Sequence, residues 1–322
     1  MKRICYLTDS LSWIQAQRAK DLQPYLPEYA LIPMLPTDAL RYAPIILAYY
    51  DAVWFASWRI ILAEPRLMDA LNLSACMASV TSHYHIGGGL KPETCFRKGT
   101  DPDQEFTKAI EVLTRFRLVT CNSKILYDLL SPHLPELVLA QNGVDAEFFH
   151  PSAEGHHWFD RRVIFPSVGW VGKDKGAKNL AIFMEAYRKI DGPWPLFPMV
   201  VPKKRGGPVK TRGGMRNFYW QTDFLACTSW HEGTPNPALE AAACGLPIIT
   251  TRVGNMPEFV TEGGTGWFIE PTAESLIACI ERLKEITPEQ YRRMSQAIRT
   301  EIEMHWTWSK RAVAYRKALE TL

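Results

Sequence analysis

The segment 230–251 constrains the fold of this chain more than any other stretch, because its prolines and one glycine limit where a helix can begin and end. Proline disrupts a helix interior but is favoured in the first helical turn, so Pro235 and Pro237 predict a helix that starts at about Pro237. Gly245 supplies a left-handed stop, and the proline two residues later forbids more helix. The apolar residues 248–251 then predict a buried strand.

Two glutamates surround this predicted loop and helix. Glu232 lies on the loop just before the helix, with Asn236 or Thr234 as the expected N-cap. Glu240 lies about one turn inside the helix, eight residues after Glu232. With either cap, Glu240 falls past the third helical position and is not the acid of a capping box. The pattern therefore indicates a polar pocket.

Two glutamates eight residues apart carry no meaning alone, but the residues around them form a recognisable set. The set comprises Glu232-Gly233-Thr234-Pro235, Glu240, Gly245-Leu-Pro247, Thr251-Arg-Val-Gly254, Pro257-Glu258 and Gly263-Gly-Thr-Gly-Trp267, preceded by the strand-like Asp223–Ser229. It resembles the nucleotide-sugar site of the retaining glycosyltransferases typified by sucrose and glycogen synthases, which are glycosyltransferase family 4, or glycosyl transferases group 1. Further matches are Thr120–Ser123 before a helix and Gln141–Asp145, which is similar to the family's interdomain hinge.

The resemblance implies an α/β chain of GT-B type, with two Rossmann-like parallel-sheet domains that hold the donor in the cleft between them. It divides the chain into an acceptor-side domain at 1–145 and a nucleotide-sugar domain at 146–305. Residues 306–322 would form a C-terminal helix that returns to the first domain, with Trp306 and Trp308 as packing residues.

The order of apolar segments supports this division independently. Strand-like runs alternate with helical patterns such as 14–26 and 106–115, which favours a parallel sheet wrapped by helices. The first series of strands is expected at 4–7, 30–34, 52–56, 77–81, 118–121 and 137–140. A second series of strands and helices is expected at 163–167, 179–190, 197–201, 217–219, 224–226, 237–244, 248–250, 267–269 and 274–286. Two α/β domains follow, with a boundary at 143–155.

Composition excludes several other classes. The chain has 322 residues, 47% of them hydrophobic and 22% charged, which is typical of a globular protein long enough for two domains. Its seven cysteines have no paired spacing, which predicts thiols in a reducing compartment. The apolar region 43–63 contains Asp51 and Arg59, which disfavour a membrane span. The start of the chain has too few consecutive apolar residues for a signal peptide, so a cytoplasmic location is expected.

Catalysis of sugar transfer requires stabilisation of the charge that grows on the departing diphosphate, and lysines near a glycine-rich segment can supply it. Residues 168–180 resemble the family segment in which a basic residue follows glycine and a lysine stands five positions later. Lys173 and Lys178 match those two places. Lysine at 173 gives a point charge without the fork of arginine. Solvated loop charges are the alternative interpretation of Lys175 and Lys178.

The resemblance assigns roles to further residues. Glu240 would bind the ribose of the nucleotide and Glu232 would face the donor sugar. Gly233 would allow close backbone approach. The amides at the helix start, near Thr234 and Ala238, would receive a phosphate or a sugar hydroxyl. Asn236 completes the donor-binding set.

A histidine in the first domain is the remaining catalytic candidate. The segment Val80–Gly89 follows a strand and places His83 at the expected strand edge, with His85 as a weaker match. The glycine pair that the family carries after the first strand is absent, and Thr8–Trp13 stands in its place.

A basic run gives the rival hypothesis. Between residues 203 and 216, six of fourteen positions are basic and none is acidic: Lys203, Lys204, Arg205, Lys210, Arg212 and Arg216. This run is expected to be a solvated loop, a source of diphosphate contacts, or a nucleic-acid contact. A DNA binder, an enzyme that glycosylates modified DNA bases and a non-catalytic sugar-nucleotide binder are therefore alternatives.

The expected enzyme needs no metal ion and no cofactor, because lysines and helix-end amides take the place of a metal. Asp101-Pro-Asp103 has the spelling of a metal-binding motif but is better interpreted as a turn or a helix start before Phe106. The donor is expected to be a UDP or GDP sugar. The acceptor, whether glycan, small molecule or modified DNA base, is not revealed by the sequence.

Overall fold

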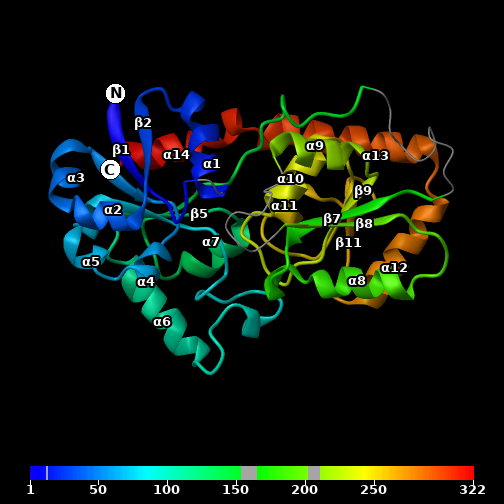
Figure 1. The fold of residues 1–322 in the computed structure, drawn as a ribbon, viewed down its shortest axis with the longest axis horizontal. Coiled ribbons are helices and arrows are strands. Elements are labelled where there is room, and N and C mark those ends of the chain that lie inside the picture. The colour runs from blue at the N-terminus through cyan, green and yellow to red at the C-terminus, as the bar shows by residue number, and fades with distance from the viewer. Residues whose placement is uncertain (12–13, 154–164, 202–210) are drawn as a thin grey trace. The chain divides into compact units, whose positions relative to one another are not determined.

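The structure is a computed structural model that describes residues 1–11, 14–153, 165–201 and 211–322. The chain divides into two compact units. Unit 1 comprises residues 1–88, 95–143 and 308–322, and unit 2 comprises residues 89–94 and 144–307. Each unit contains one parallel sheet covered by helices (Figure 1). The predicted fold class is thereby confirmed.

Unit 1 contains a six-stranded parallel sheet with the order β2-β1-β3-β4-β5-β6. Its strands are β1 Lys2–Leu7, β2 Tyr29–Met34, β3 Ala52–Phe55, β4 Cys76–Val80, β5 Leu118–Cys121 and β6 Leu137–Leu139. All six lie where the apolar runs predict them, to within two residues at each end. Because β2 and β3 lie on opposite sides of β1, the order in which strands are added to the sheet reverses between β1 and β3.

Helices cover both faces of this sheet. They are α1 Ile14–Leu22, α2 Pro36–Arg41, α3 Ala43–Tyr49, α4 Ile60–Ala63, α5 Leu67–Ala70, α6 Pro102–Leu113, α7 Lys124–Leu130 and α14 Trp308–Glu320. Alternate residues of β1 point to opposite faces, so Ile4 and Tyr6 pack with α1 and α14 while Cys5 and Leu7 pack under α2 and α3. Figure 1 shows α14 beside α1 and β1.

Unit 2 contains a five-stranded parallel sheet with the order β11-β10-β9-β7-β8. Its strands are β7 Val168–Lys173, β8 Leu196–Val201, β9 Phe224–Cys227, β10 Ile248–Thr250 and β11 Gly266–Phe268. The helices are α8 Leu180–Lys189, α9 Arg212–Trp220, α10 Asn236–Ala243, α11 Met256–Phe259, α12 Ala273–Arg282 and α13 Pro288–Glu301, followed by a π-helical turn at Ile302–Trp306.

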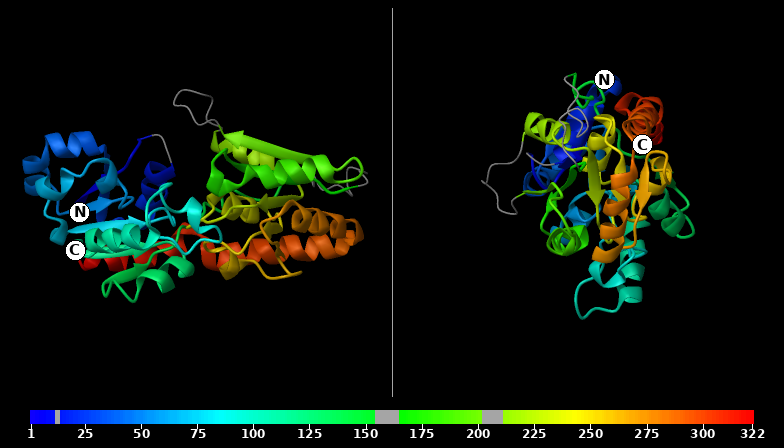
Figure 2. Two further views of the ribbon diagram at one scale, coloured as in Figure 1. Left: turned by 90° about the horizontal axis from the view of Figure 1, so that it is seen from below. Right: turned by 90° about the vertical axis from the view of Figure 1, so that its right-hand side faces the viewer.

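The helices of unit 2 form two layers. Leu225 and Ile248 pack under α10, whereas the next residues along the same strands, Ala226 and Ile249, pack with α8 and α12. In Figure 1, α9 and α10 lie on one side of the sheet and α8 and α12 on the other; both figures show α8 and α12 side by side (Figure 2). The sheet is therefore buried on both faces, as its continuous apolar strands predict.

The strand predicted at 163–167 is not present over its described residues, 165–167. Residues 163 and 164 lie outside the described residues, and the strand in this region, β7, begins at Val168. The glycines within it resemble a loop in the sequence, but they are packing positions. A Cβ at Gly169 would lie 2.8 Å from the ring of Phe218, and one at Gly172 would lie 2.7 Å from the ring of Trp170. Only glycine lets these aromatic rings lie against the strand.

The C-terminal helix begins elsewhere than the sequence suggests. The C-terminal segment is not one helix from Trp306, because Trp306 ends a π-helical turn in unit 2 and α14 begins at Trp308 in unit 1. Asp101 is the N-cap of α6, where its side chain accepts a hydrogen bond from the amide of Asp103 at 3.0 Å, so of the two predicted alternatives, a turn and a helix start, the helix start is confirmed. Neither α9 nor α13 was predicted as a helix.

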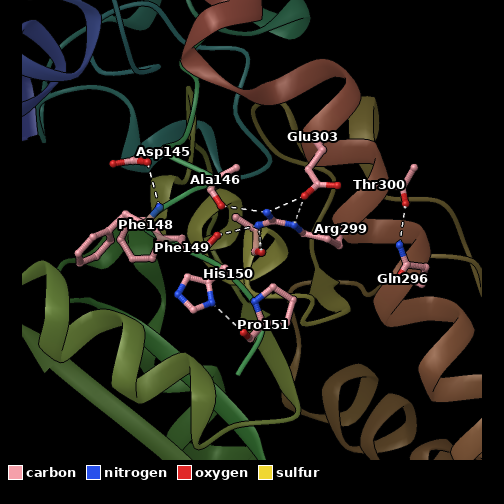
Figure 3. Close-up of polar contacts among 11 residues, drawn as sticks. Asp145, Ala146, Phe148, Phe149, His150, Pro151, Gln296, Arg299, Thr300 and Glu303 are labelled. Atoms are coloured by element: carbon pink, nitrogen blue, oxygen red, sulfur yellow. Dashed lines mark hydrogen bonds and ion pairs between the residues drawn. The ribbon is translucent and has the colours of Figure 1, made fainter. Parts of the chain in front are cut away.

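Arg299 on α13 joins three parts of unit 2 (Figure 3). Its Nη1 donates to the carbonyls of Phe149 (2.7 Å) and Ala243, and its Nη2 donates to the carbonyl of Ala146 at 2.9 Å. Its Nε donates to Glu303 at 2.7 Å. Ala243 ends α10, so the guanidinium satisfies a terminal helix carbonyl that has no intrahelical donor. Arg299 thereby fixes the end of α10 against the start of unit 2.

None of the helices in the described ranges combines the length and the apolar character that crossing a membrane requires.

Candidate functional site

Strands β7, β9 and β10 end at one edge of the unit 2 sheet. Because the strands are parallel, Lys173 at the end of β7, Thr228 and Ser229 after β9 and Thr251 after β10 share that edge. Ligands of open α/β sheets bind outside the carboxyl ends of the strands. We therefore take this edge as the candidate site.

An ion pair joins two of the predicted site residues. Lys178 Nζ lies 2.5 Å from Glu232 Oε1, and Ser229 Oγ donates to the same oxygen at 2.7 Å. The Lys178 side chain is 28% exposed and that of Glu232 is 11% exposed. The pair is thus partly shielded from water, while the ammonium group stays accessible to a ligand. The structure brings Lys178 and Glu232 together although they are 54 residues apart.

The backbone at Lys178 is fixed by the segment after β9. Thr228 Oγ1 donates to the carbonyls of Lys178 (3.3 Å) and Asn179 (3.0 Å), and it accepts a hydrogen bond from the indole of Trp170 at 3.0 Å. Asn179 adopts a left-handed conformation with a φ of 52°, which is uncommon for a residue with a side chain. Such conformations persist only where the surroundings determine them. The lysine is therefore held in place before any ligand binds.

The loop that carries Glu232 rests against the loop after β10. Gly254 has a φ of 54°, and a Cβ there would collide with the carbonyl oxygen of Gly233. Thr251 Oγ1 also donates to the carbonyl of Ser229 at 2.7 Å. These contacts explain why glycine stands at 254 in the motif.

Glu240 lies on α10 and has a partner on α9. The hydroxyl of Tyr219 donates to Glu240 Oε2 at 2.7 Å. Burial raises the pKa of Tyr219 well above its usual value, and the charge of Glu240 acts in the same direction. The tyrosine therefore stays protonated and donates to the carboxylate of Glu240.

A small recess lies at this edge between β7, β9 and the start of α10. It is lined by Trp170, Val171, Lys178, Leu225, Ala226, Cys227, Ser229, Pro235, Pro237 and Ala238. Burial raises the pKa of the Cys227 thiol, with the charge of Glu232 adding to the effect. A thiol held neutral in this way is a poor nucleophile, so the chemistry of the edge belongs to its charged groups.

The start of α10 differs from the prediction by one residue. The helix begins at Asn236, with Pro235 as its N-cap, so neither Asn236 nor Thr234 caps it. The amide of Ala238 was expected to be open to a ligand. This expectation is wrong, because that amide donates to the carbonyl of Pro235 at 2.8 Å and closes the first turn. Thr234 and Asn236 are half-buried beside it.

The remaining predicted residues occupy separate positions. Lys173 is the last residue of β7 and is half-buried at the same edge as Lys178. His83 lies in unit 1, is 1% exposed, and its Nδ1 donates to the carbonyl of Gly87 at 2.6 Å. This bond gives His83 a structural role in the loop after β4.

The basic run is only partly described. Lys203, Lys204, Arg205 and Lys210 lie outside the described residues. Arg212 and Arg216 belong to α9 and not to a loop. Arg212 forms a 2.9 Å ion pair with Asp145, and Arg216 lies over the rings of Phe148 and Trp220 at 4.7 and 4.5 Å. Both arginines therefore interact with side chains of unit 2.

The sequence pattern did not point to Ser229 and Tyr219, the partners of the two glutamates. Ser229 follows a predicted strand at the carboxyl edge, which is a signal that could have found it. Tyr219 gave no such signal, because α9 was not recognised as a helix facing α10. Over the described residues, no group of three or more His, Cys, Asp or Glu side chains is placed to hold a metal ion.

Comparison with known sequences agrees with this geometry. A family model described as "Glycosyl transferases group 1" matches residues 207–301. An uncharacterised glycosyltransferase of Methanocaldococcus jannaschii is 26% identical over 63% of this chain and 59% of its own length. Spore coat protein SA of Bacillus subtilis is 33% identical over 29% of this chain and 25% of its own length. The chain thus spans between a quarter and three fifths of these two relatives.

Comparison with solved structures covers the whole chain. Sucrose-phosphate synthase from Thermosynechococcus elongatus has a TM-score of 0.78 at 15% identity, with 100% of both chains covered. The HepE protein of Anabaena, solved in complex with UDP-glucose, has a TM-score of 0.74 at 15% identity, again with 100% of both chains covered. At this identity the likeness shows the fold, which is GT-B. The family match lies in the segment 207–301, which contains α10 and both glutamates, and it shows that this segment is similar to the glycosyl transferases of group 1.

Proposed function

We propose that this protein is a retaining glycosyltransferase that transfers a sugar from a nucleoside-diphosphate sugar to an acceptor hydroxyl without a metal ion. The observation that carries the proposal is the ion pair between Lys178 and Glu232 at the carboxyl edge of the unit 2 sheet. Without a ligand, the carboxylate compensates the ammonium charge. A bound diphosphate would take over the ammonium group and leave Glu232 facing the sugar.

The cationic groups account for the proposed chemistry. As the bond between the sugar and the diphosphate breaks, negative charge grows on the leaving oxygen, and a cation fixed in a partly dry site stabilises that charge. Lys178 is fixed in this way by Thr228 and Asn179. Lys173, at the end of β7, would be the second cation. In this proposal the acceptor hydroxyl attacks an oxocarbenium-like centre from the face that the leaving group departs, and a phosphate oxygen takes its proton.

The position of Glu240 supports a nucleotide donor. A carboxylate accepts hydrogen bonds from two ribose hydroxyls, and the hydroxyl of Tyr219 holds this one in place. The UDP-glucose complex of HepE, which shares the fold, makes UDP the first nucleotide to test. Gly233, Thr234 and Asn236 would complete the donor site.

The first experiment screens the donor. Thermal unfolding is measured with UDP, GDP and ADP and with their common sugar derivatives, and one nucleotide at about 100 times its Kd should stabilise the protein by about 2.7 kcal/mol. Transfer with that donor is then followed by NMR in the presence and absence of EDTA. We expect a product with the anomeric configuration of the donor and a rate that EDTA does not change. An inverted product would contradict the retaining mechanism, and no stabilisation by any nucleotide would contradict the proposal as a whole.

A further inference from the structure

The loops at the carboxyl edge of the unit 1 sheet contain an arginine that the proposed donor chemistry does not use. The direction of strand order changes between β1 and β3, and this is the position where open α/β sheets bind ligands. Asp9 follows β1 and Arg59 follows β3, so the two residues lie on either side of the reversal in strand order.

Arg59 lies over an aromatic ring and not against a carboxylate. Its Cζ is 4.8 Å from the ring centroid of Tyr84, and within the described ranges it forms no ion pair. The residue is exposed to solvent, yet burial of the guanidinium lowers its pKa, while the nearby Tyr84 and Asp9 act in the opposite direction. A guanidinium that rests on a ring face keeps the N–H groups at its edge available, in the fork that matches an oxyanion.

The loop that carries Tyr84 is held in an uncommon conformation. The next residue, His85, has a φ of 64°, although it is not glycine. Its amide donates to the carbonyl of Cys95 at 2.8 Å, and its Nδ1 lies 2.9 Å from Glu105 Oε2. Strained residues that the surroundings hold in place cluster at ligand sites. His85 and Glu105 therefore fix the ring on which Arg59 rests.

The residue before Arg59 in the sequence carries a buried hydrogen-bond donor that has no acceptor among the residues described. This residue is Trp58, which is 1% exposed, and the donor is its indole N–H. An unsatisfied buried donor costs about 1–3 kcal/mol, so a donor of this kind is normally satisfied by a group that the chain or a ligand supplies. This observation is independent of the Arg59 geometry.

We infer that Arg59, resting on Tyr84, binds the anionic group of the acceptor, and that the acceptor is a carbohydrate or polyol that carries a phosphate or carboxylate. The inference rests on the proposed function, since it takes the ligand of unit 1 to be the acceptor. Asp9, on the other side of the reversal in strand order, accepts hydrogen bonds from the hydroxyl groups of the acceptor substrate. Phosphate and carboxylate are both oxyanions that the arginine fork fits, so the experiment separates them.

The test uses the full chain and four probes: glucose, glucose 6-phosphate, glucuronate and inorganic phosphate. Each probe is titrated by calorimetry with a saturating concentration of the nucleoside diphosphate that binds unit 2, so that phosphate cannot occupy the donor site. We expect glucose 6-phosphate or glucuronate to bind at least about 10-fold more tightly than glucose. The tighter of the two identifies the anionic group.

The variants assign the effect to Arg59. Arg59→Gln should weaken the charged probe by about 10- to 100-fold, and Arg59→Lys should weaken it less because the charge remains without the fork. Arg66→Gln is the matched control, since Arg66 is 72% exposed and pairs with Glu64 away from this edge. Circular dichroism confirms that each variant is folded.

Two outcomes overturn the inference. One is equal binding, or equal absence of binding, of charged and neutral probes by the parent protein. The other is a charged probe that binds Arg59→Gln, or Arg59→Lys if the first variant does not fold, as tightly as it binds the parent. Failure of every nucleotide to bind would count against the proposed function instead, because the comparison of parent and Arg59 variants remains valid without a nucleotide.

Discussion

The two ends of α10 each lie close to a fixed cation, but the two cations have different surroundings. Near the start of the helix, Lys178 pairs with the side chain of Glu232 and remains 28% exposed. At the other end, Arg299 is 14% exposed, pairs with Glu303 and also donates to the carbonyls of Ala146, Phe149 and Ala243. A carboxylate partner can exchange for a ligand phosphate, whereas backbone carbonyls of a packed core cannot. We therefore expect Lys178 to act in the reaction and Arg299 to stabilise the fold.

The largest expected effect is on turnover. Lys178→Ala removes the cation that stabilises the leaving group and should lower kcat by about 10²- to 10³-fold. Its cost in stability should be about 1 to 3 kcal/mol, because it leaves the largely buried carboxylate of Glu232 without its cation. Single-turnover kinetics and thermal unfolding measure the two effects. Lys175→Ala, which removes the same charge three residues away on the exposed loop, is the control, and equal losses in both variants would refute a specific role for Lys178.

Arg299→Ala should lower stability more than it lowers donor binding. It leaves carbonyls at the end of α10 and in the segment 146–149 without a charged donor, which should cost about 2 to 4 kcal/mol in the free energy of unfolding. Urea unfolding measures this loss. Donor affinity per folded molecule should stay close to that of the parent, and a large loss of affinity with unchanged stability would reverse the comparison.

The contact between Glu240 and Tyr219 lies between these extremes. Tyr219→Phe removes one hydrogen bond to the carboxylate and should weaken binding of the nucleotide about 5-fold, since such a bond contributes about 1 kcal/mol. Glu240→Ala removes both oxygens and should weaken binding more. Calorimetry with the nucleotide selected in the donor screen measures both variants. Stronger weakening by Tyr219→Phe than by Glu240→Ala would show that the tyrosine acts independently of the glutamate.

The smallest predicted effect concerns the helix that carries Arg299. Thr287 caps α13 in a capping box, where its side chain accepts from the amide of Gln290 at 3.2 Å. Thr287→Ala should cost about 1 kcal/mol of stability. Thr287→Ser, which keeps the hydroxyl, should cost less. If the alanine variant also reduced turnover, the two ends of α10 would not be divided between catalysis and stability.

The sequence predicts most of this fold because the strands of both sheets are buried on both faces and appear as continuous apolar runs. It misleads where a side chain elsewhere decides the local structure. Gly169 and Gly172 resemble a loop, yet the ring of Trp170 requires glycine at 172, and the ring of Phe218, which is distant in the sequence, requires it at 169. The polar helix α13 was missed because few of its residues are apolar, and its capping box was the available signal.

The candidate site was predictable only in part, and for a physical reason. Glu232 and Glu240 lie within one short motif, so the local pattern predicts them together. The pairing of Lys178 with Glu232 depends on β7 and β9 being neighbours in the sheet, which the resemblance implied and periodicity alone did not. The contact of Tyr219 with Glu240 depends on α9 facing α10. Contacts of this kind follow from packing and not from the sequence between the two residues.

The most direct test of the account is a thermodynamic cycle between Lys178 and the ligand. The parent and Lys178→Ala are titrated by calorimetry with the diphosphate and the monophosphate of the nucleoside that binds. If Lys178 contacts the diphosphate, the variant should lose at least about 10-fold in affinity for the diphosphate and much less for the monophosphate, as expected for a charge-assisted hydrogen bond. Equal losses for both ligands, or no loss for either, would contradict the claim that this lysine binds the leaving group of the reaction.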